Sequence, residues 1–306
     1  MRVAIVTCTN IPEKDADEDL MLQALRQAGI PASLVAWDDA RVDWTTFRGA
    51  IIRSTWNYHQ HLARFLDWVS HTSTVLKLMN PAWAVRANAH KSYLARLQGR
   101  GIPIVPTAWV SRHENARPDL RRIISEQSWN TDDGIVIKPS VSASSFKTRR
   151  FHASELEAAQ GFLEELLQER DAMVQPYLRH FAEGGESALV WLNDGEGGEL
   201  THKVTKLPRF GDDQEAVVAA ADITDSERAF AERVLDVELG ERRNELMYAR
   251  IDVIDAGKDG LRLSELELIE PSLYLSHCEP ALRRFVQAAG RVAHFEERRQ
   301  PGETWP

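Results

Sequence analysis

The sequence predicts a parallel β/α unit at the N-terminus followed by two units of mixed α+β structure. Residues 1–82 alternate short apolar strands with helical segments, a pattern that is typical of a parallel sheet. The last third contains two glycine-rich turns, 193–198 and 255–260, each between strand-like runs, which indicates antiparallel hairpins. The pair Asn80-Pro81 breaks the chain between these regions. We therefore divide the chain into residues 1–82, 83–178 and 179–306.

The first unit begins with an apolar strand and contains two more. A helix that ends before Gly29 separates the first two strands, because glycine readily adopts the backbone conformation that terminates a helix. In chain order the expected elements are strand 3–8, helix 17–27, strand 33–37, strand 49–53 and helix 62–69. Ligands of parallel sheets bind at the carboxyl ends of the strands, so the loops after residues 8 and 53 are candidate site loops.

In the central unit, the lysine at the end of a strand is the main feature. We expect a helix over 88–100, a strand over 134–139 that presents Lys138, a helix over 154–169 with Ser154 and Glu157 as a capping box, and a strand over 172–178. The loop 140–145 after Lys138 consists of small residues, which let backbone N–H groups approach phosphate oxygens closely.

The third unit is expected to be mainly antiparallel. Its two hairpins join strands 186–192 to 199–206 and 246–254 to 261–268. An amphipathic helix over 225–239 lies between the hairpins, and a helix over 280–297 closes the unit.

Composition excludes several classes of protein. The chain has 306 residues and a net charge of −9, which gives no electrostatic reason for it to bind nucleic acid or an anionic membrane. No apolar run approaches the roughly 20 residues that span a bilayer, and the N-terminus lacks the features of a signal peptide. Cys8 and Cys278 are too few for a disulfide framework. We expect a cytoplasmic protein with both thiols buried.

Two glutamates that alternate along a strand are the strongest functional signal. Side chains two residues apart on a strand share a face, so Glu265 and Glu267 point the same way and Leu266 points to the opposite face. Carboxylates on one face repel unless a cation lies between them, and oxygen ligands suit Mg²⁺ or Mn²⁺. Taken alone, the pair is also compatible with a solvent-exposed acidic face.

Polar residues follow two strands of the first unit. Arg53 emerges from an apolar strand and is a candidate for anion binding, although pairing with a nearby Asp or Glu for structural reasons is equally compatible. The first strand lacks the glycine fingerprint of dinucleotide-binding proteins, which disfavours a dehydrogenase. The histidines lack the spacing of zinc ligands, which disfavours a zinc enzyme.

The order of these features resembles the ATP-grasp superfamily over roughly residues 1–295. The order is Lys91 on a helix, Lys138 at a strand end, the segment 175–178, Glu186, Arg250-x-Asp252, and Glu265-x-Glu267. The resemblance implies an ATP-grasp fold, in which a first domain on the substrate side, residues 1–82, precedes two α+β lobes that enclose ATP. These lobes would be residues 83–178 and residues 179–306, the second carrying the metal site. Many members end the last motif with Asn where this chain has Glu267.

The resemblance also implies roles for individual residues. ATP would contact Lys91, Lys138, Ser142, Ser144, Ser145, Gln175, Tyr177, Leu178 and Glu186. Magnesium, or manganese, would be held by Asp252, Glu265 and Glu267. Arg250, Lys206 and Arg53 would act in catalysis, and the substrate would contact Thr9, Asn10, Arg53, Ser54, Thr55, Tyr58 and Ser272.

Several strings, among them IRSTWNYH, VIKPSVSASS and ELELIEPSLYL, resemble one subgroup of cyclo-ligases within the superfamily. This subgroup includes the cyclo-ligase that closes the ring of D-cycloserine in antibiotic biosynthesis. The resemblance implies that ATP phosphorylates the carboxylate of O-ureido-D-serine and that a nitrogen of the same molecule attacks the acyl phosphate. Intramolecular attack is favoured entropically once the substrate is held in a folded pose.

Two alternatives remain open at this point. One is an intermolecular ligase that joins a carboxylate to a separate amine, with an amino acid or dipeptide as substrate. The other is a nucleotide-binding module without catalysis, although such a module needs few of the charged residues that this chain contains. The expected partner is a small carboxylate, with no nucleic acid and no membrane, and the association of copies of this chain stays open.

Overall fold

Three β-sheets organise the residues described by the computed structural model, which are 2–11, 13–113, 118–207 and 217–293. The first sheet has the strand order β2-β1-β3-β4, and all of its neighbouring strands are parallel. Its strands are β1 (Arg2–Thr7), β2 (Ala32–Ala36), β3 (Phe47–Ser54) and β4 (Lys77–Met79). The parallel sheet predicted for the N-terminal unit is therefore confirmed.

Alternating side chains on these strands pack against helices on both faces of the sheet. Val3 and Ile5 of β1 contact a cluster built with α1 (Glu18–Gln27) and α9 (Glu279–Ala293). Ala4 and Val6 face the opposite cluster, which includes α2 (Leu62–Val75) and α3 (Ala82–Asn88). This period of two follows from the geometry of a strand that is buried on both sides.

The second sheet is antiparallel and has the order β11-β10-β9-β12-β13. Its strands are β9 (Glu186–Asn193), β10 (Gly198–Lys206), β11 (Val217–Ala221), β12 (Tyr248–Asp255) and β13 (Leu261–Glu267). One face packs on α4 (Tyr93–Gly99) and α8 (Asp225–Leu239), and the other face shares α9 with the first sheet. Helix α9 therefore joins the N-terminal sheet to this second sheet.

The third sheet is antiparallel and has the order β5-β8-β6-β7. Its strands are β5 (Ala108–Val110), β6 (Ile135–Pro139), β7 (Arg149–Phe151) and β8 (Ala172–Pro176). Helices α5 (Leu120–Glu126) and α6 (Leu156–Leu167) cover one face, and α7 (Arg179–Gly184) leads on to β9. Short 3₁₀ turns lie at Trp44–Thr46, Tyr58–Gln60, Ala153–Glu155, Gly240–Glu245, Gly257–Asp259 and Leu275–His277.

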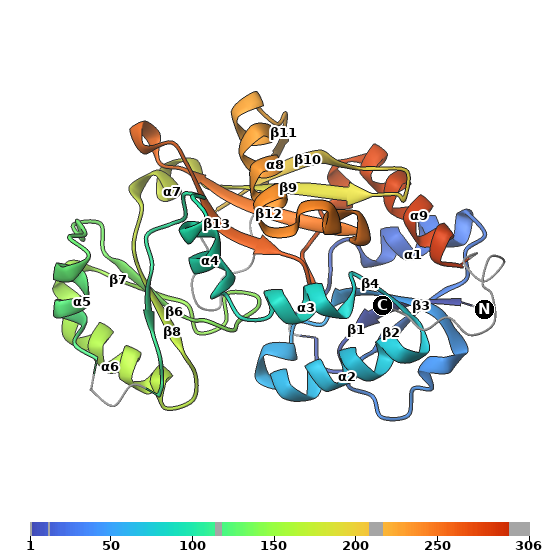
Figure 1. The fold of residues 1–306 in the computed structure, drawn as a ribbon, viewed down its shortest axis with the longest axis horizontal. Coiled ribbons are helices and arrows are strands. Elements are labelled where there is room, and N and C mark those ends of the chain that lie inside the picture. Colours follow the sequence, from blue (N-terminus) through green and yellow to red (C-terminus); the bar gives the residue numbers. More distant parts are fainter. Residues whose placement is uncertain (1, 12, 114–117, 208–216, 294–306) are drawn as a thin grey trace.

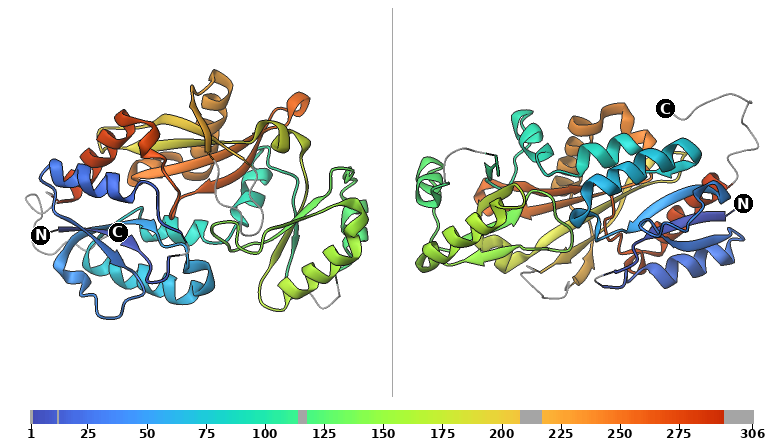
Figure 2. Two further views of the ribbon diagram at one scale, coloured as in Figure 1. Left: turned by 180° about the vertical axis from the view of Figure 1, so that it is seen from behind. Right: turned by 90° about the horizontal axis from the view of Figure 1, so that it is seen from below.

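The sheets are arranged so that the second sheet connects the other two. The third sheet lies at one end of the molecule and the first sheet at the other, with β9, β12 and β13 beside both (Figure 1). The views from behind and from below show the same order (Figure 2). The division at residues 82/83 and 178/179 remains our proposal for the domain boundaries.

The helix expected over 88–100 is wrong in its first half. Helix α3 ends at Asn88 and α4 begins at Tyr93, so Lys91 lies in the turn between them. In this turn the backbone N–H of Lys91 donates to the carbonyl of Ser140, which ties it to the loop after β6. The sequence pattern did not indicate this break, because no glycine or proline lies between Ala82 and Gln98.

Other local predictions differ from the structure in smaller ways. The capping box lies at His152 and Glu155, where Glu155 accepts a hydrogen bond of 2.7 Å from the His152 backbone, and not at Ser154 and Glu157. Cys8 is buried as expected, but Cys278 is only half-buried. The expected end of the last helix, residues 294–297, lies outside the described residues. Among the described residues, no helix is long and apolar enough to cross a membrane.

Candidate functional site

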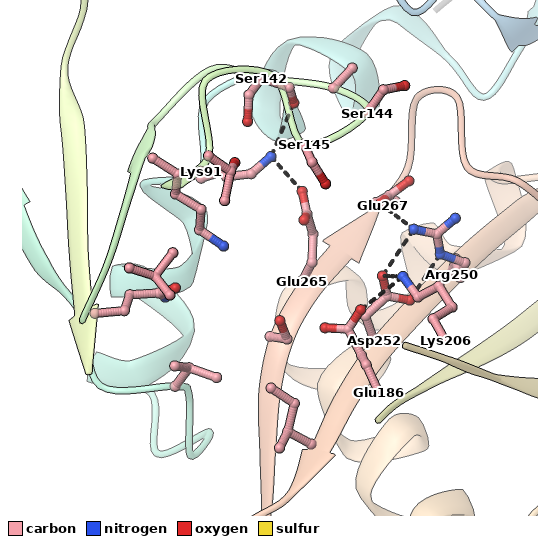
Figure 3. Close-up of a pocket in the computed structure, with 18 of the residues that line it drawn as sticks. Lys91, Ser142, Ser144, Ser145, Glu186, Lys206, Arg250, Asp252, Glu265 and Glu267 are labelled. Atoms are coloured by element: carbon pink, nitrogen blue, oxygen red, sulfur yellow. Dashed lines mark hydrogen bonds and ion pairs between the residues drawn. The ribbon is translucent and has the colours of Figure 1, made fainter. Parts of the chain in front are cut away.

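A polar pocket lies where elements of all three sheets meet, and charged side chains line much of it. The contributing segments are the serine loop, which we define as residues 140–148, the ends of β8 and β9, the centres of β12 and β13, and the loop after β3. The labelled side chains in Figure 3 point into this pocket from the serine loop on one side and from β12 and β13 on the other.

Strand register brings the charged residues of β12 and β13 face to face. Asp252 lies directly opposite Glu265, and Arg250 lies directly opposite Glu267. Two like charges in directly opposite positions destabilise an antiparallel pair. The pair Asp252 and Glu265 is therefore an arrangement that folding alone does not favour, and nearby cations must offset its repulsion.

Arg250 and Lys206 supply positive charge on one side of this pair. The Arg250 guanidinium donates to both carboxylate oxygens of Asp252, at 2.8 and 2.9 Å, and forms a further ion pair with Glu267. The ammonium of Lys206 lies 2.7 Å from Asp252 and 2.8 Å from Glu186, its partner across β9 and β10. Burial disfavours the charged forms of Asp252 and Lys206, but their ion pairs outweigh it, so the pKa of Asp252 is lowered and that of Lys206 is raised well above its ordinary value.

Lys91 supplies positive charge on the other side. Its ammonium lies 2.5 Å from the Glu265 carboxylate and donates to the carbonyl of Ser142 at 3.2 Å (Figure 3). The turn that carries Lys91 is fixed beside β13 because the Asn88 side chain bonds the backbone of Leu266 and of Leu268, at 2.8 and 2.9 Å. Burial lowers the pKa of Lys91 but Glu265 outweighs it, so the pKa is raised.

Lys138 at the end of β6 also lines the pocket. Within the described parts of the chain its ammonium has no hydrogen bond or ion pair, and burial lowers its pKa. The adjoining serine loop contains three non-glycine residues with positive φ: Ser144 at 49°, Ser145 at 56° and Lys147 at 49°. Such residues cost conformational energy and gather at ligand sites, where successive backbone N–H groups can be turned toward an anion.

The charge balance of the pocket tests whether a divalent cation fits. Six carboxylates and four cationic side chains line it, so the formal surplus is two negative charges. Burial together with Glu265 and Asp252 outweighs Arg250 and raises the pKa of Glu267 to about 7. Oxygen donors that repel one another in this way fit Mg²⁺. Among the described residues, however, no three such side chains are grouped closely enough to hold an ion, because each carboxylate of the expected set faces a lysine or arginine.

Comparison with known proteins shows the same fold throughout the chain. A family model described as the D-cycloserine synthetase DcsG, N-terminal domain, matches residues 3–80. The cycloserine biosynthesis protein DcsG of Streptomyces lavendulae is 29% identical over 94% of this chain and 97% of its own. The crystal structure of D-cycloserine synthetase DcsG superposes with a TM-score of 0.83 at 29% identity, covering 95% of this chain and all of that one.

More distant structures share the fold alone. The ATP-grasp RimK domain protein of Sphaerobacter thermophilus has a TM-score of 0.63 at 20% identity, covering 96% of this chain and 99% of that one. The D-alanyl-alanine synthetase A of Vibrio cholerae has a TM-score of 0.65 at 9% identity, covering 96% and 98%. The chain has the fold of the ATP-grasp ligases. It is similar to D-cycloserine synthetase DcsG over nearly its whole length.

Most of the residues expected from the ATP-grasp resemblance line the pocket. They are Tyr58, Lys91, Lys138, Ser142, Ser144, Ser145, Gln175, Tyr177, Leu178, Glu186, Lys206, Arg250, Asp252, Glu265, Glu267 and Ser272. They come from segments up to 214 residues apart in the sequence, between Tyr58 and Ser272. Their individual roles remain predictions.

Five of the expected residues do not line the pocket. Arg53 is fully buried and donates to Asp15 and to the carbonyl of Pro271. Ser54 and Thr55 are buried beside it, and Thr9 and Asn10 are exposed, Thr9 being held by Asp38. The alternative of a structural pairing for Arg53 therefore matches the observed contacts.

The sequence prediction also missed several residues of the pocket wall. Glu270 follows the E-x-E motif and is 8% exposed, and Trp56 follows Arg53. Glu270 is the third acidic residue in the segment that begins at Glu265, so its position there was a signal, but it was not included among the expected metal ligands. An apolar group was missed because its members are distant in sequence and have no common pattern: Val105, Val136, Pro176, Phe181 and Ile254.

Proposed function

We propose that the chain is a magnesium-dependent cyclo-ligase that activates a substrate carboxylate with ATP and closes a ring by attack of a nitrogen of the same molecule. The ATP-grasp fold and the similarity to D-cycloserine synthetase support the assignment as a ligase. The specific proposal is supported by the match with D-cycloserine synthetase over nearly the whole chain. The observation that carries it is a pocket lined by four cationic side chains and six carboxylates, in which Asp252 lies directly opposite Glu265 on the neighbouring strand.

The apolar end of the pocket suits an adenine ring. Val136 of β6 and Ile254 of β12 contribute to its walls, and the Gln175 side chain is fixed by a hydrogen bond of 2.8 Å to Thr107. Leu178 precedes α7 and follows the end of β8, where backbone groups no longer pair with a neighbouring strand. We assign adenine to this end and the ribose hydroxyls to Glu186.

The cationic side chains suit the phosphates. Lys138 has no partner within the described residues, so a phosphate oxygen would give it one. Lys91 and Lys206 pair with carboxylates, and each reaches the pocket interior. Positioned positive charge is the main requirement for phosphoryl transfer, because the protein has little covalent work to do.

Asp252, Glu265 and Glu267 would hold the metal. A divalent ion there would neutralise carboxylate repulsion and the charge of the triphosphate together. Binding of nucleotide would then release Lys91 and Arg250 from their present carboxylate partners to contact phosphate or substrate. The surplus of negative charge in the pocket makes nucleotide binding without a divalent cation unfavourable.

The reaction follows from these roles. A carboxylate oxygen of the substrate bonds to the γ-phosphorus of ATP, the bond to ADP breaks, and an acyl phosphate forms. A nitrogen of the same substrate then bonds to the acyl carbon, the carbon–oxygen bond to phosphate breaks, and the nitrogen loses a proton. Arg250, which is buried and faces the pocket, would stabilise the negative charge on the reacting carboxyl group.

The first experiment measures ADP release with Mg-ATP and O-ureido-D-serine as the only other substrate, with the product mass recorded. The proposal requires ADP and a ring product that is lighter than the substrate by one water, or by one water and the carbamoyl group (as HNCO) where hydrolysis of that group follows ring closure. ADP that forms only after a second amine is added would assign the chain to the intermolecular ligases. Tight ATP binding without ADP from any carboxylate would favour a binding module, an alternative that the complete set of pocket lysines and carboxylates disfavours.

A further inference from the structure

Glu270 lies in the pocket wall on a segment of unusually fixed backbone. The carbonyl oxygens of six consecutive residues, 268–273, each accept a hydrogen bond from a side chain of another element. The donors, in order along the segment, are Asn80, Tyr248, Trp56, Arg53, Arg250 and His202, at distances between 2.7 and 3.2 Å.

This arrangement holds the side chain of Glu270 in place without using it. Its own carbonyl is held by the indole of Trp56 at 3.2 Å, and the following carbonyl, of Pro271, is held by Arg53 at 2.7 Å. A segment that is fixed on both sides of a residue presents that residue to the pocket in one orientation. Groups that are positioned in this way before a ligand arrives lose little entropy when they bind it.

The carboxylate of Glu270 is buried without a partner. Glu270 is 8% exposed, and within the described residues its carboxylate accepts no hydrogen bond and forms no ion pair. Glu186, Asp252, Glu265 and Glu267 differ, because each has a lysine or arginine as partner. A buried carboxylate without a counter-charge is costly. Burial and the neighbouring Glu267 accordingly raise the pKa of Glu270 well above its ordinary value.

The surroundings of Glu270 suit a small cationic group. Tyr58 and Glu13, from loops of the first sheet, line the same pocket and add a hydroxyl and a second acidic residue. On the other side, Arg250 donates to the carbonyl of Ser272, two residues from Glu270, at 3.2 Å. A group bound between Glu270 and Arg250 would meet negative charge at one end and positive charge at the other. An α-amino acid complements both, because it carries an ammonium group next to a carboxylate.

We infer that Glu270 binds the ammonium group of an α-amino acid substrate and so directs the neighbouring carboxylate toward Arg250. This inference rests on the proposed function, since it names the substrate class of the same site. Glu270 is thereby a specificity-determining residue: a carboxylic acid without the amine leaves Glu270 buried and unpaired. The site then selects amino acids over simple carboxylic acids of equal size.

The test compares Glu270→Gln with the wild-type enzyme on two substrates, O-ureido-D-serine and its analogue without the amine, 3-(ureidooxy)propanoate. Loss of a buried charge partner predicts that KM of the amino acid rises about 30-fold or more in the variant, while KM of the analogue changes little. KM of ATP and the magnesium concentration for half activation should stay the same. Glu279→Gln, an exposed residue on α9, serves as the matched control.

Three results would overturn the inference. Equal losses for both substrates would show that Glu270 does not read the amine. A changed magnesium requirement would make it part of the metal site. A loss of thermal stability in Glu270→Gln that accounts for the whole effect would make the role of Glu270 structural. Glu270→Asp keeps the charge, so it should restore part of the preference for amino acids only if the ammonium contact exists.

Failure of the proposed function gives a different result. If wild-type enzyme forms no ADP from O-ureido-D-serine, the cyclo-ligase proposal fails. The inference about Glu270 is then tested by measuring the shift in melting temperature with Mg²⁺ and a non-hydrolysable ATP analogue present. A series of D- and L-amino acids is compared with the matching carboxylic acids. Stabilisation by amino acids alone, lost in Glu270→Gln, supports the inference, and equal stabilisation by both series, or by neither, overturns it.

Discussion

The guanidinium of Arg53 and the carbonyl oxygen of Pro271 are joined by a hydrogen bond of 2.7 Å across 218 residues of sequence. Arg53 lies one residue before the end of β3, an inner strand of the parallel sheet, and Pro271 follows the acidic motif of the antiparallel sheet. The second guanidinium nitrogen lies 3.2 Å from Asp15, and both side chains are buried. Arg53 therefore links the substrate-side sheet to the segment that carries Glu270 and Ser272.

Replacing Arg53 with Met should lower the free energy of unfolding by about 3–5 kcal/mol, because the substitution leaves the Asp15 carboxylate buried without its cation. Urea unfolding at constant pH measures this. In the double variant Arg53→Met, Asp15→Asn the buried charge is gone, so part of the loss should return. A double variant no more stable than Arg53→Met would mean that the hydrogen bond to Pro271, and not the charge, dominates.

Glu265→Gln should reduce kcat at saturating ATP by at least about 100-fold, since the variant keeps the shape of the side chain but removes the charge of a proposed metal ligand. The same change removes the partner of Lys91, so KM of ATP should not rise in proportion. Steady-state ADP release at several magnesium concentrations separates the two effects. Glu199→Gln is the control, because this residue is exposed and its pair with Arg284 lies on the surface. Unchanged kcat in Glu265→Gln would exclude the metal role.

Sequence pattern predicted the sheets well because they depend on local periodicity. The apolar runs of β1 and β9, the alternation of apolar and charged residues in β12 and the glycine-rich turns indicate strands and hairpins within a few residues. Short elements were missed. Strand β4 has three residues and helix α3 has seven, and both exist because they pack against α2 and β3, which is information that no short window of sequence contains.

The site was predicted where residue type determines the role and missed where tertiary contacts do. Glu265 and Glu267 line the pocket because a strand places them on one face. Arg53 was expected in the same pocket from its position near a strand end, yet its two terminal guanidinium nitrogens donate to Pro271 and Asp15. These partners lie 38 and 218 residues away, so the sequence pattern could not choose between the anion-binding and structural interpretations.

His59 gives the fold a defined response to acid. It is buried and its ring lies 4.4 Å from that of Phe146 in the serine loop. Burial, aided by Arg170 and Lys91, lowers its pKa from 6.5 to about 4. Because the folded state binds the proton less readily than the unfolded state, stability falls as pH drops from about 6.5 to about 4. This residue should account for up to about 3 kcal/mol of that loss.

The measurement is the free energy of unfolding of wild type and His59→Gln at pH 7 and pH 4.5. The difference between the two proteins should shrink or reverse at the lower pH, because glutamine does not titrate. His113→Gln, at an exposed site, should follow wild type at both pH values. Parallel pH profiles for wild type and His59→Gln would mean that His59 takes up its proton in the folded state as easily as in the unfolded chain.

Asn80, where the first unit passes into the second, fixes the centre of the antiparallel sheet. It is fully buried, its amide nitrogen donates to the carbonyls of Tyr248 and Leu268 at 2.8 Å, and its oxygen accepts from the backbone of Met247 and Tyr248. Asn80→Ala leaves these backbone groups buried without their partner and should cost about 4 kcal/mol of stability.

The matched comparison for Asn80 is Asn88→Ala, which removes two hydrogen bonds to β13 at a half-buried position that water can reach more easily. Its cost should be about 1–2 kcal/mol. Since the backbone N–H groups of Met247 and Tyr248 donate to Asn80, its loss should also increase hydrogen exchange at these two residues. If the two variants lose the same free energy of unfolding, burial of the bonded groups does not determine the loss. Asn80 would then contribute no more than Asn88 to holding the sheets together.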